Sequence, residues 1–248
     1  MPCHRPAMRL SLSLSFLLLL PAHALAEPSI IKLYTEELPP YNTLLPDGRI
    51  GGSATQKVEA ILKDAKLSHT LELTSWARAF GLARIQANSC VYSTARTPER
   101  EAQFKWIGEL ARIDGVLFAL ADRPRNSPAT MEAAMGTRIG GYHSSASALY
   151  MVKKGYNVIM SANHDISLKN LLAGRLDFWL ASRTTGQLLI DKQGVNGKVV
   201  PVIPVLNLEL YLACNAAMEP AQIQRLQQSF AQLQADGTLA AIDRQFRE

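Results

Sequence analysis

Strand-like and helix-like segments alternate along this chain in an order that occurs twice. In the first half, three strand-like runs and two helices with one apolar face follow one another at 29–34, 55–66, 71–73, 76–86 and 90–94. Residues 36–52, rich in proline and glycine, form a long loop after the first run. This β-loop-α-β-α-β order is typical of an open sheet covered by helices, so the sequence predicts the α/β class.

The same order returns after Gly115 and predicts a second α/β unit. Strands and helices are expected there at 116–121, 127–136, 138–141, 146–154, 157–160, 165–174, 176–181, 184–193 and 198–202. Asp165 is the expected cap of the helix that ends at Gly174. A last strand at 209–214 and two helices separated by Gly237 close the chain.

One strand leading out of the first unit and another leading back predict two lobes joined by a two-strand hinge. Residues 27–115 and 212–248 then form lobe one, and residues 116–211 form lobe two. The crossing strands are expected near 116–121 and 209–214. A cleft between two such lobes is the natural place for a ligand. A single doubly wound domain is the alternative that the pattern leaves open.

The first 26 residues have the features of a secretory signal peptide. Two arginines precede the apolar run from Leu10 to Leu20, and the segment ends in the small-residue pattern Ala24-Leu25-Ala26. That run is too short to span a bilayer with ease. We therefore expect export to the periplasm, cleavage before Glu27 and a soluble monomer. An uncleaved N-terminal anchor is the alternative.

The charge of the mature chain does not indicate nucleic acid as a partner. The full chain has 26 basic and 21 acidic residues. Removing residues 1–26 takes away two basic residues and no acidic one, which leaves 24 against 21, or +3. No cluster of lysine and arginine appears in the sequence. A balance this mild argues against a nucleic-acid-binding protein.

Motifs for common catalytic and metal sites are missing from the sequence. The chain contains no P-loop, no G-x-S-x-G and no H-E-x-x-H. His69, His143 and His164 each lack a second ligand at metal spacing. We therefore predict neither a metal site nor a cofactor.

Two cysteines, Cys90 and Cys214, remain in the mature chain. Each lies in an apolar, strand-like run, where a buried free thiol is the usual state. An exported compartment also permits a disulfide between them. The sequence does not decide between the two states.

The segment from Thr97 to Glu101 is the first candidate for a ligand site. It follows the strand at 90–94, and α/β sheets bind ligands beyond the carboxyl ends of their strands. Pro98 fixes the turn, so Arg100 lies at a fixed offset from the strand end. Its guanidinium group suits a carboxylate held by two parallel hydrogen bonds. A solvated turn with Glu–Arg pairs would explain the same residues.

The segment from Tyr142 to Ser147 is the second candidate, because it follows a strand and opens a helix. Backbone N–H groups at a helix start, with the hydroxyl groups of Ser144 and Ser145, suit a carboxylate or another anion. Helix capping explains the serines equally well. Three aromatic residues that fall in or next to loops after strands can line the cleft or pack in the core: Tyr41, Trp76 and Tyr142.

Asp177 stands at the start of the apolar strand at 176–181. A carboxylate in such a position needs a partner, because leaving it buried and unpaired is costly. An ammonium group on a ligand would serve, and so would Arg175 or Arg183. The residues alone leave these partners equally plausible.

With these segments in order, the chain resembles bacterial solute-binding protein family 3, the amino-acid-binding receptors of ABC importers. The resemblance runs from Leu33-Tyr34-Thr35-Glu36 to Ala235-Asp236-Gly237-Thr238-Leu239. It is strongest to a divergent branch with Trp-x-Arg-Ala, at Trp76 to Ala79, and Arg-Thr-Pro-Glu-Arg-Glu, at Arg96 to Glu101. The resemblance implies the type II two-lobed fold of the periplasmic binding proteins, with an ABC permease as membrane partner.

The resemblance also implies roles for particular residues. The arginine of the family's Thr-x-x-Arg motif binds the ligand α-carboxylate, which implies Arg100. Hydroxyl residues at the helix start of lobe two add donors, which implies Ser144 and Ser145. The aspartate after Gly-Arg-Leu accepts from the α-ammonium group, which implies Asp177, and the aromatic residue after the second strand stacks on the ligand, which implies Trp76.

Three departures from the family pattern leave the ligand open. Ala95 replaces a hydroxyl residue two positions before Thr97, so one donor is lost. Arg96 stands beside the site and favours an acidic or polar ligand. Ser144 replaces the glycine that precedes the hydroxyl of lobe two. An amino acid or a related carboxylate remains the expected ligand.

The expected function is binding without catalysis, as the receptor of an ABC importer. An enzyme on the same fold, resembling cyclohexadienyl dehydratase, is one alternative, with Glu36, Glu37 and His143 as candidate acids and bases. A ligand sensor for a separate signalling partner is the other. The predicted ligand-binding residues are Glu36, Tyr41, Trp76, Ala95, Arg100, Tyr142, Ser144, Ser145 and Asp177.

Overall fold

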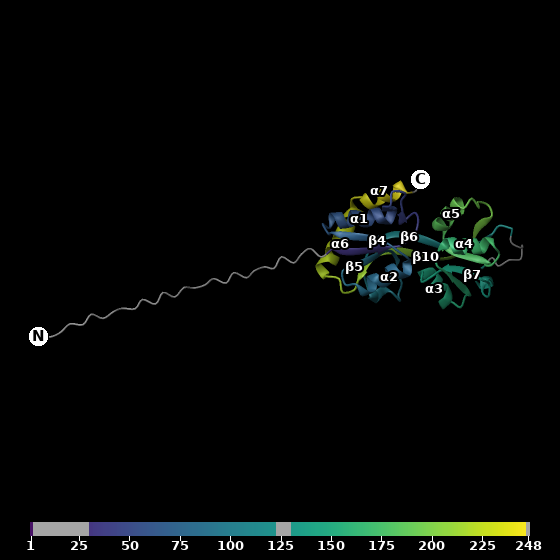
Figure 1. Ribbon diagram of the computed structural model, residues 1–248, viewed down its shortest axis with the longest axis horizontal. Coiled ribbons are helices and arrows are strands. Elements are labelled where there is room, and N and C mark those ends of the chain that lie inside the picture. Colours follow the sequence, from purple (N-terminus) through teal and green to yellow (C-terminus); the bar gives the residue numbers. More distant parts are fainter. Residues whose placement is uncertain (2–29, 123–129, 247–248) are drawn as a thin grey trace.

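Two long antiparallel strands, β6 (Phe104–Leu120) and β10 (Val199–Asn215), run through both halves of the molecule (Figure 1). The structure is a computed structural model that describes Met1 and residues 30–122 and 130–246. The predicted signal peptide, its cleavage site and the start of the helix predicted at 127–136 lie outside the described residues. Of that helix, the short 3-10 turn η2 (Glu132–Ala134) falls in the described part.

The sheet has eight strands in the order β4-β1-β5-β10-β6-β9-β7-β8. β5 pairs with the C-terminal part of β10, from Leu210 to Cys214, whereas β9 pairs with the later part of β6, from Gly115 to Phe118. One part of each of these two strands therefore belongs to the lobe-one half of the sheet and another part to the lobe-two half. β6 and β10 are thus the connections between the lobes. The lobe boundaries predicted from the sequence fall within these two strands.

The described part of lobe one contains three parallel strands and four helices. The strands are β1 (Ile31–Thr35), β4 (His69–Leu73) and β5 (Ser89–Ala95). The helices are α1 (Ser53–Asp64), α2 (Trp76–Ile85), α6 (Pro220–Ala235) and α7 (Thr238–Gln245), with η1 (Glu101–Gln103) after β5. The loop after β1 contains the small hairpin of β2 (Thr43–Leu44) and β3 (Ile50–Gly51). Val58, Ile61 and Leu62 of α1 are buried against the sheet, as the helical spacing predicts.

In its described residues, lobe two repeats the scheme with three parallel strands and three helices. The strands are β7 (Ile139–Tyr142), β8 (Val158–Ser161) and β9 (Phe178–Ser182), and the helices are α3 (Ala146–Lys153), α4 (His164–Leu172) and α5 (Arg183–Lys192). Asn163, and not the predicted Asp165, caps α4, because its side chain accepts from the N–H of Ile166. Separate apolar clusters lie on the two faces of this half of the sheet.

β10 is longer than the two separate strands predicted at 198–202 and 209–214. Pro201 and Pro204 lie inside it, and the pairing with β6 changes register directly after each of them. Proline lacks the N–H that a ladder requires, so strands tolerate it at bulges. The sequence pattern was therefore interrupted at 203–208, although the strand continues through those residues.

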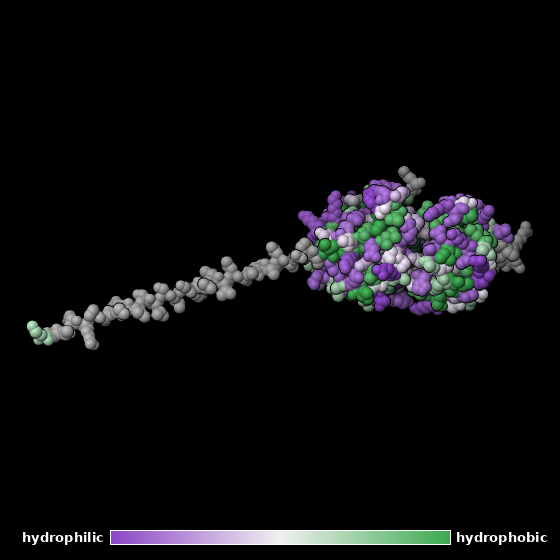
Figure 2. Space-filling model, in the orientation of Figure 1, coloured by the Kyte–Doolittle hydropathy of each residue, from purple (hydrophilic) through white to green (hydrophobic). Residues whose placement is uncertain are grey.

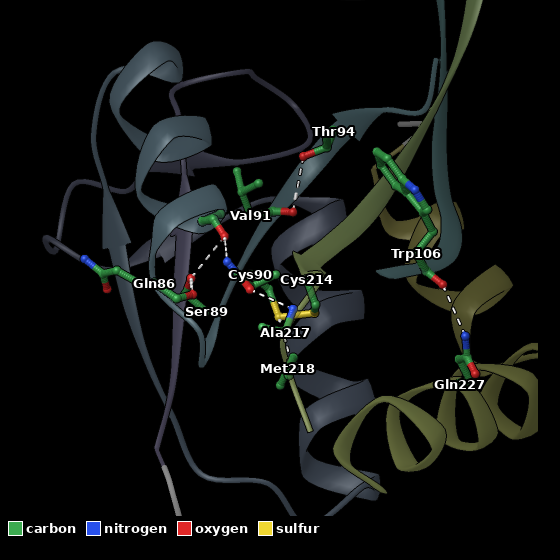
Figure 3. Close-up of a disulfide and its surroundings, with 12 residues drawn as sticks. Gln86, Ser89, Cys90, Val91, Thr94, Trp106, Cys214, Ala217, Met218 and Gln227 are labelled. Atoms are coloured by element: carbon green, nitrogen blue, oxygen red, sulfur yellow. Dashed lines mark hydrogen bonds between the residues drawn. A yellow bond between two sulfur atoms is a disulfide. The ribbon is translucent and has the colours of Figure 1, made fainter. Parts of the chain in front are cut away.

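Cys90 of β5 and Cys214 of β10 form a disulfide, one of the two states that the sequence left open. The two residues are direct partners in the antiparallel ladder. Figure 3 shows them facing each other beside Met218, and all three are buried in the core of lobe one. Because β10 returns to lobe one after the chain has formed lobe two, this bond closes a covalent loop around the whole second lobe.

The outer surface mixes polar and apolar residues. Figure 2 shows both kinds on the visible face, with a groove at the boundary between the lobes. Within the part of the chain that the structure describes, no helix has both the length and the apolar character needed to span a bilayer.

Candidate ligand site between the lobes

A cavity of about 60 Å³ lies between the lobes. Its walls come from the carboxyl ends of β1, β5, β7 and β9, from the starts of α2, α3 and α4, and from the hinge strands β6 and β10. Strand ends and helix starts of this kind are where α/β sheets bind ligands. The lining residues are Glu36, Leu38, Trp76, Ser93, Ala95, Arg100, Ile113, Tyr142, Ser145, Ala146, Ser147, His164, Ala181, Ser182, Leu208 and Leu210.

Arg100 is the buried cation of this cavity. Its side chain emerges from the turn after β5, and the residue is 6% exposed. Nη1 donates to the carbonyl of Ala95 and Nη2 donates to the carbonyl of Ser144, each over 3.2 Å. The guanidinium group lies 4.8 Å from the ring centre of Phe80 and 5.4 Å from that of Trp76. Among the described residues, no carboxylate lies within ion-pair distance of it.

Burial lowers the pKa of Arg100 to about 10, while Glu99 and Glu36 favour the charged form from a greater distance. The group is therefore still cationic at neutral pH. A buried cation without an ionic partner is costly, and an anion placed in the cavity would relieve that cost. The alternative explanation of this segment, a solvated turn with Glu–Arg pairs, does not fit an arginine that is buried to this extent.

The two lobes touch across the cavity. The backbone carbonyl of Ser144 in lobe two accepts from Arg100 and also from the indole N–H of Trp76, at 2.9 Å. The hydroxyl of Tyr142 accepts from the backbone N–H of Trp76 at 3.1 Å. Thr185 of α5 donates to the carbonyl of Pro39 in lobe one at 3.0 Å. These contacts hold the cleft in a closed arrangement.

Glu36 directly follows β1 and is 6% exposed. Its Oε2 is buried and has no hydrogen-bond partner among the described residues. Burial raises the pKa of Glu36 to about 8, against the opposing effects of Tyr142 and Arg100. At neutral pH the cavity thus presents this group mainly as a neutral carboxylic acid.

We expect Glu36 to make stability fall as pH rises. The folded protein keeps a proton on Glu36 up to about pH 8, whereas the unfolded chain releases it near 4.5. Between these values the free energy of unfolding decreases by about 1.4 kcal/mol per pH unit from this group alone. Glu36→Gln removes the effect, so the free energies of wild type and variant, measured by urea unfolding, should diverge by about 3–4 kcal/mol between pH 5 and pH 8.

His164 changes the stability with pH in the opposite direction to Glu36, and it is present in both the wild type and the Glu36→Gln variant. Burial lowers the pKa of His164 to about 4, so its contribution to stability is lost as pH falls from 6.5 toward 4. The difference between wild type and Glu36→Gln cancels this background. If the free energies of unfolding of the wild type and the variant run parallel between pH 5 and pH 8, Glu36 does not have a raised pKa.

The structure adds four polar residues to the site that the sequence interpretation did not select: Ser93, Ser147, His164 and Ser182. Ser182 ends β9 and caps α5 by accepting from the N–H of Thr185 at 3.0 Å. Like Ser145, Ser182 stands where a strand ends and a helix begins. The sequence interpretation selected Ser145 on that ground but did not select Ser182. His164 was considered solely as a metal ligand. No group of three or more potential metal ligands occurs among residues 30–122 and 130–246.

Asp177 does not lie in the cavity, which corrects its predicted placement. It precedes β9 at the amino end, whereas Ala181 and Ser182 reach the cavity at the carboxyl end of the same strand. Its carboxylate accepts from Arg138 Nη2 at 2.8 Å, from Nε at 3.1 Å and from the backbone N–H at 2.7 Å. The partner is a neighbouring arginine that the sequence interpretation did not consider, and these bonds lower the pKa of Asp177.

Two other predicted residues contribute differently from the prediction. Tyr41 lies outside the cavity and lines a separate hollow with Lys57 and Thr184. The hydroxyl of Ser144 is hydrogen-bonded to His143 at 2.8 Å, so this residue takes part through its backbone carbonyl. The remaining predicted residues line the cavity as expected: Glu36, Trp76, Ala95, Arg100, Tyr142 and Ser145.

Comparison with known proteins identifies the fold. No protein-family model and no curated protein sequence matches the chain. A histidine kinase sensor domain with similarity to periplasmic binding proteins matches with a TM-score of 0.81 and 18% identity, over 88% of this chain and 96% of that one. An ancestral arginine-binding protein bound to arginine matches with a TM-score of 0.77 and 17% identity, over 88% and 98%.

A third solved structure is an ancestral amino-acid-binding protein, a precursor of cyclohexadienyl dehydratase. It matches with a TM-score of 0.74 and 13% identity, over 88% of this chain and 95% of that one. Amino-acid-binding proteins are thus prominent among the matches, as the resemblance to solute-binding protein family 3 implies. The chain has the two-lobed α/β fold of the periplasmic binding proteins, with a two-strand hinge and a cleft between its lobes.

Proposed function

We propose that this chain is a periplasmic receptor that binds a small carboxylate, an amino acid or a related acid, between its lobes without transforming it. An ABC permease in the membrane is the proposed recipient of the ligand. The signal-peptide features of residues 1–26 support export. The amino-acid-binding proteins among the matching structures support a small carboxylate as ligand.

The observation that carries the proposal is the state of Arg100. A guanidinium group buried in a cavity, bonded to two backbone carbonyls and lacking a carboxylate partner among the described residues, is a site prepared for an anion. The N-terminus of α3 lies in the same cavity through Ser145, Ala146 and Ser147. N–H groups of a first helical turn have no acceptor within the helix, and they favour negative charge.

The contacts between the lobes support a receptor that closes around its ligand. Arg100 belongs to lobe one, and the Ser144 carbonyl that it contacts belongs to lobe two. An anion bound by Arg100 and by the start of α3 would touch both lobes. Such a ligand stabilises the closed form over an open one, because it makes contacts in the closed form that the open form lacks.

A second candidate is an enzyme on the same fold, and Glu36 favours it. A carboxyl group with its pKa near 8 in a cleft is suited to general acid–base chemistry at neutral pH. Tyr142 and His164 line the same cavity and could take part. The other two residues considered from the sequence have local partners outside it: Glu37 accepts from Thr43 and Leu44, and His143 bonds to Ser144.

A sensor for a separate signalling partner differs from an importer receptor in what the closed form contacts. The match to a histidine kinase sensor domain makes this the third candidate. Copurification with a permease or with a sensor kinase after crosslinking would separate the two.

A thermal-shift screen of the mature protein tests the proposal. The ligands are amino acids, 2-hydroxy acids, 2-oxo acids and small amines. A true ligand at about 100 times its Kd stabilises the folded state by about 2.7 kcal/mol. For a protein of this size that corresponds to a rise in Tm of roughly 5–11 °C.

Carboxylates should raise the Tm, and amines without a carboxylate should not. The mixture is then analysed by NMR after prolonged incubation with each hit. Unchanged ligand is the expected result, whereas a new product would select the enzyme. A stabilising amine with no effect from any carboxylate would contradict the proposed ligand class.

A further inference from the structure

We propose that the molecule has a second ligand site, outside the cavity that Arg100 lines, for a small anion with an apolar or aromatic body. The site is a hollow of about 510 Å³, which we call the α3 hollow. Its walls are the turn at 96–100 in lobe one, α3 with its C-cap Lys154 in lobe two, and Leu206 and Leu208 of β10. This second site goes beyond the proposed function and does not depend on it.

The α3 hollow has the size of an ordinary ligand site. Sites for small molecules measure about 300–1,000 Å³, whereas the cavity between the lobes measures about 60 Å³. The two spaces adjoin, because Arg100, Ala146 and Leu208 line both. A cavity of about 150 Å³ takes one benzene ring. An aromatic ligand therefore has room in the α3 hollow and not in the closed cavity.

Apolar side chains form much of the wall of the α3 hollow. Leu149 and Tyr150, which are consecutive on α3, are 48% and 38% exposed. Pro98 of the turn and the two leucines of β10, Leu206 and Leu208, line the same hollow. A ligand that covers these side chains removes apolar surface from water, which stabilises the complex. Apolar walls in a concave surface are typical of ligand sites and indicate a ligand with an apolar or aromatic body.

The charged residues of the α3 hollow favour an anion. Two of its cations, Arg100 and Lys154, form no ion pair with a carboxylate within the described residues. The ammonium group of Lys154 lies 5.7 Å from the ring centre of Tyr150. The other basic residues of the wall, Arg96 and Lys153, are each paired with a glutamate. The hollow thus has a surplus of positive charge, which attracts a negatively charged group.

The α3 hollow is shared between the lobes. Glu99 belongs to the turn in lobe one and Lys153 to α3 in lobe two, and they form an ion pair at 2.6 Å along its wall. An occupant would therefore touch both lobes. Because those contacts exist only while the lobes are together, the occupant favours the closed form.

Fluorescence titration with 2-naphthoate and 2-naphthamide tests the proposal. The two probes have the same ring system, and 2-naphthoate alone is an anion. We expect 2-naphthoate to bind the mature protein at one saturable site with a Kd below about 100 μM. The amide should bind at least about threefold more weakly. Lys154→Gln should narrow that difference, since it removes one of the two unpaired cations.

Variants of two exposed leucines locate the probe. Leu149→Glu places a carboxylate in the α3 hollow and removes an apolar contact, so it should weaken 2-naphthoate at least about tenfold. Leu188→Glu is the matched control. It makes the same change at a leucine of α5 that is 40% exposed and lines neither the hollow nor the cavity, and it should stay within about threefold of wild type. Melting curves show whether each variant is folded.

Tyr150→Ala is the second variant of the hollow, for the case that Leu149→Glu does not fold. It changes no charge, so it should weaken 2-naphthoate and 2-naphthamide by a similar factor. Unchanged affinity of this variant for both probes would show that they bind elsewhere.

The outcomes separate this second site from the proposed function. If 2-naphthoate shows no saturable binding up to about 1 mM, or if Leu149→Glu binds it as Leu188→Glu does, the second site is wrong. An amide that binds as tightly as the acid overturns the preference for an anion. Full displacement of 2-naphthoate by a small carboxylate from the thermal-shift screen would place the probe in the cleft and also overturn the site. If that screen finds no carboxylate ligand, the proposed function fails, while the variants of Leu149 and Leu188 still decide the second site.

Discussion

Arg100→Ala is expected to weaken the binding of a carboxylate ligand by about 2–5 kcal/mol. The guanidinium group is buried in a cavity that the two lobes close, so its bonds to a carboxylate would be sheltered from water. Removing it leaves the ligand's charge unpaired at the same place. The loss corresponds to a roughly 30-fold to several-thousand-fold increase in Kd, measured by calorimetry.

Two further variants show whether the loss of affinity comes from the two parallel hydrogen bonds of the Arg100 guanidinium group or from the loss of a positive charge in general. Arg100→Lys should recover a part of the affinity, because one ammonium group cannot make two parallel bonds. Arg96→Ala removes the adjacent arginine, which is paired with Glu101 outside the cavity. It should change the Kd by less than about threefold. An equally small effect of Arg100→Ala would show that the carboxylate is anchored elsewhere.

The second large effect concerns the disulfide between Cys90 and Cys214. These residues are 124 positions apart, and the loop they close contains all of lobe two. Cross-linking a loop of this length restricts the unfolded chain, and removal of such a bond typically costs about 2–5 kcal/mol. The double variant Cys90→Ala, Cys214→Ala should therefore melt roughly 4–20 °C lower than wild type.

Two measurements accompany this prediction. Thiol titration of the denatured mature protein should find no free thiol. In strong reductant the difference in Tm between the two proteins should shrink to the effect of truncating two buried side chains. Two free thiols per chain, or equal melting temperatures without reductant, would contradict the disulfide.

The sequence was sufficient for the fold class because local signals agreed with one another. Helical spacing in α1 and strand patterns at the positions of β5 and β9 each matched what those segments form. Tertiary pairing overrode local signals in β10, where two prolines interrupt the pattern and β6 supplies a continuous partner. The disulfide likewise depends on the register of β5 against β10, which no local pattern encodes.

The site was predictable where a residue follows a strand at its carboxyl end. Arg100, Tyr142 and Ser145 satisfy that rule, and they line the cavity. Asp177 precedes its strand, so the same rule places it at the far end, where Arg138 of a neighbouring segment meets it. Ser182, at the correct end of that strand, was passed over because a single serine looks like an ordinary cap.

Protonation states could not be predicted from the sequence at all. Glu36 and His164 have unremarkable sequence neighbours, and their shifted pKa values arise from burial in a cavity that both lobes build. The assembled structure is therefore needed to see that burial shifts the pKa of these two groups in opposite directions.

The proposed function depends above all on Arg100 holding a ligand carboxylate in the cleft between the lobes. A crystal structure of the mature protein with the tightest ligand of the screen would show whether it does. We expect a closed cleft with both carboxylate oxygens at about 2.7–3.0 Å from the guanidinium nitrogens of Arg100. A ligand bound outside the cleft, or inside it with its carboxylate turned away from Arg100, would show that Arg100 is not the anchor.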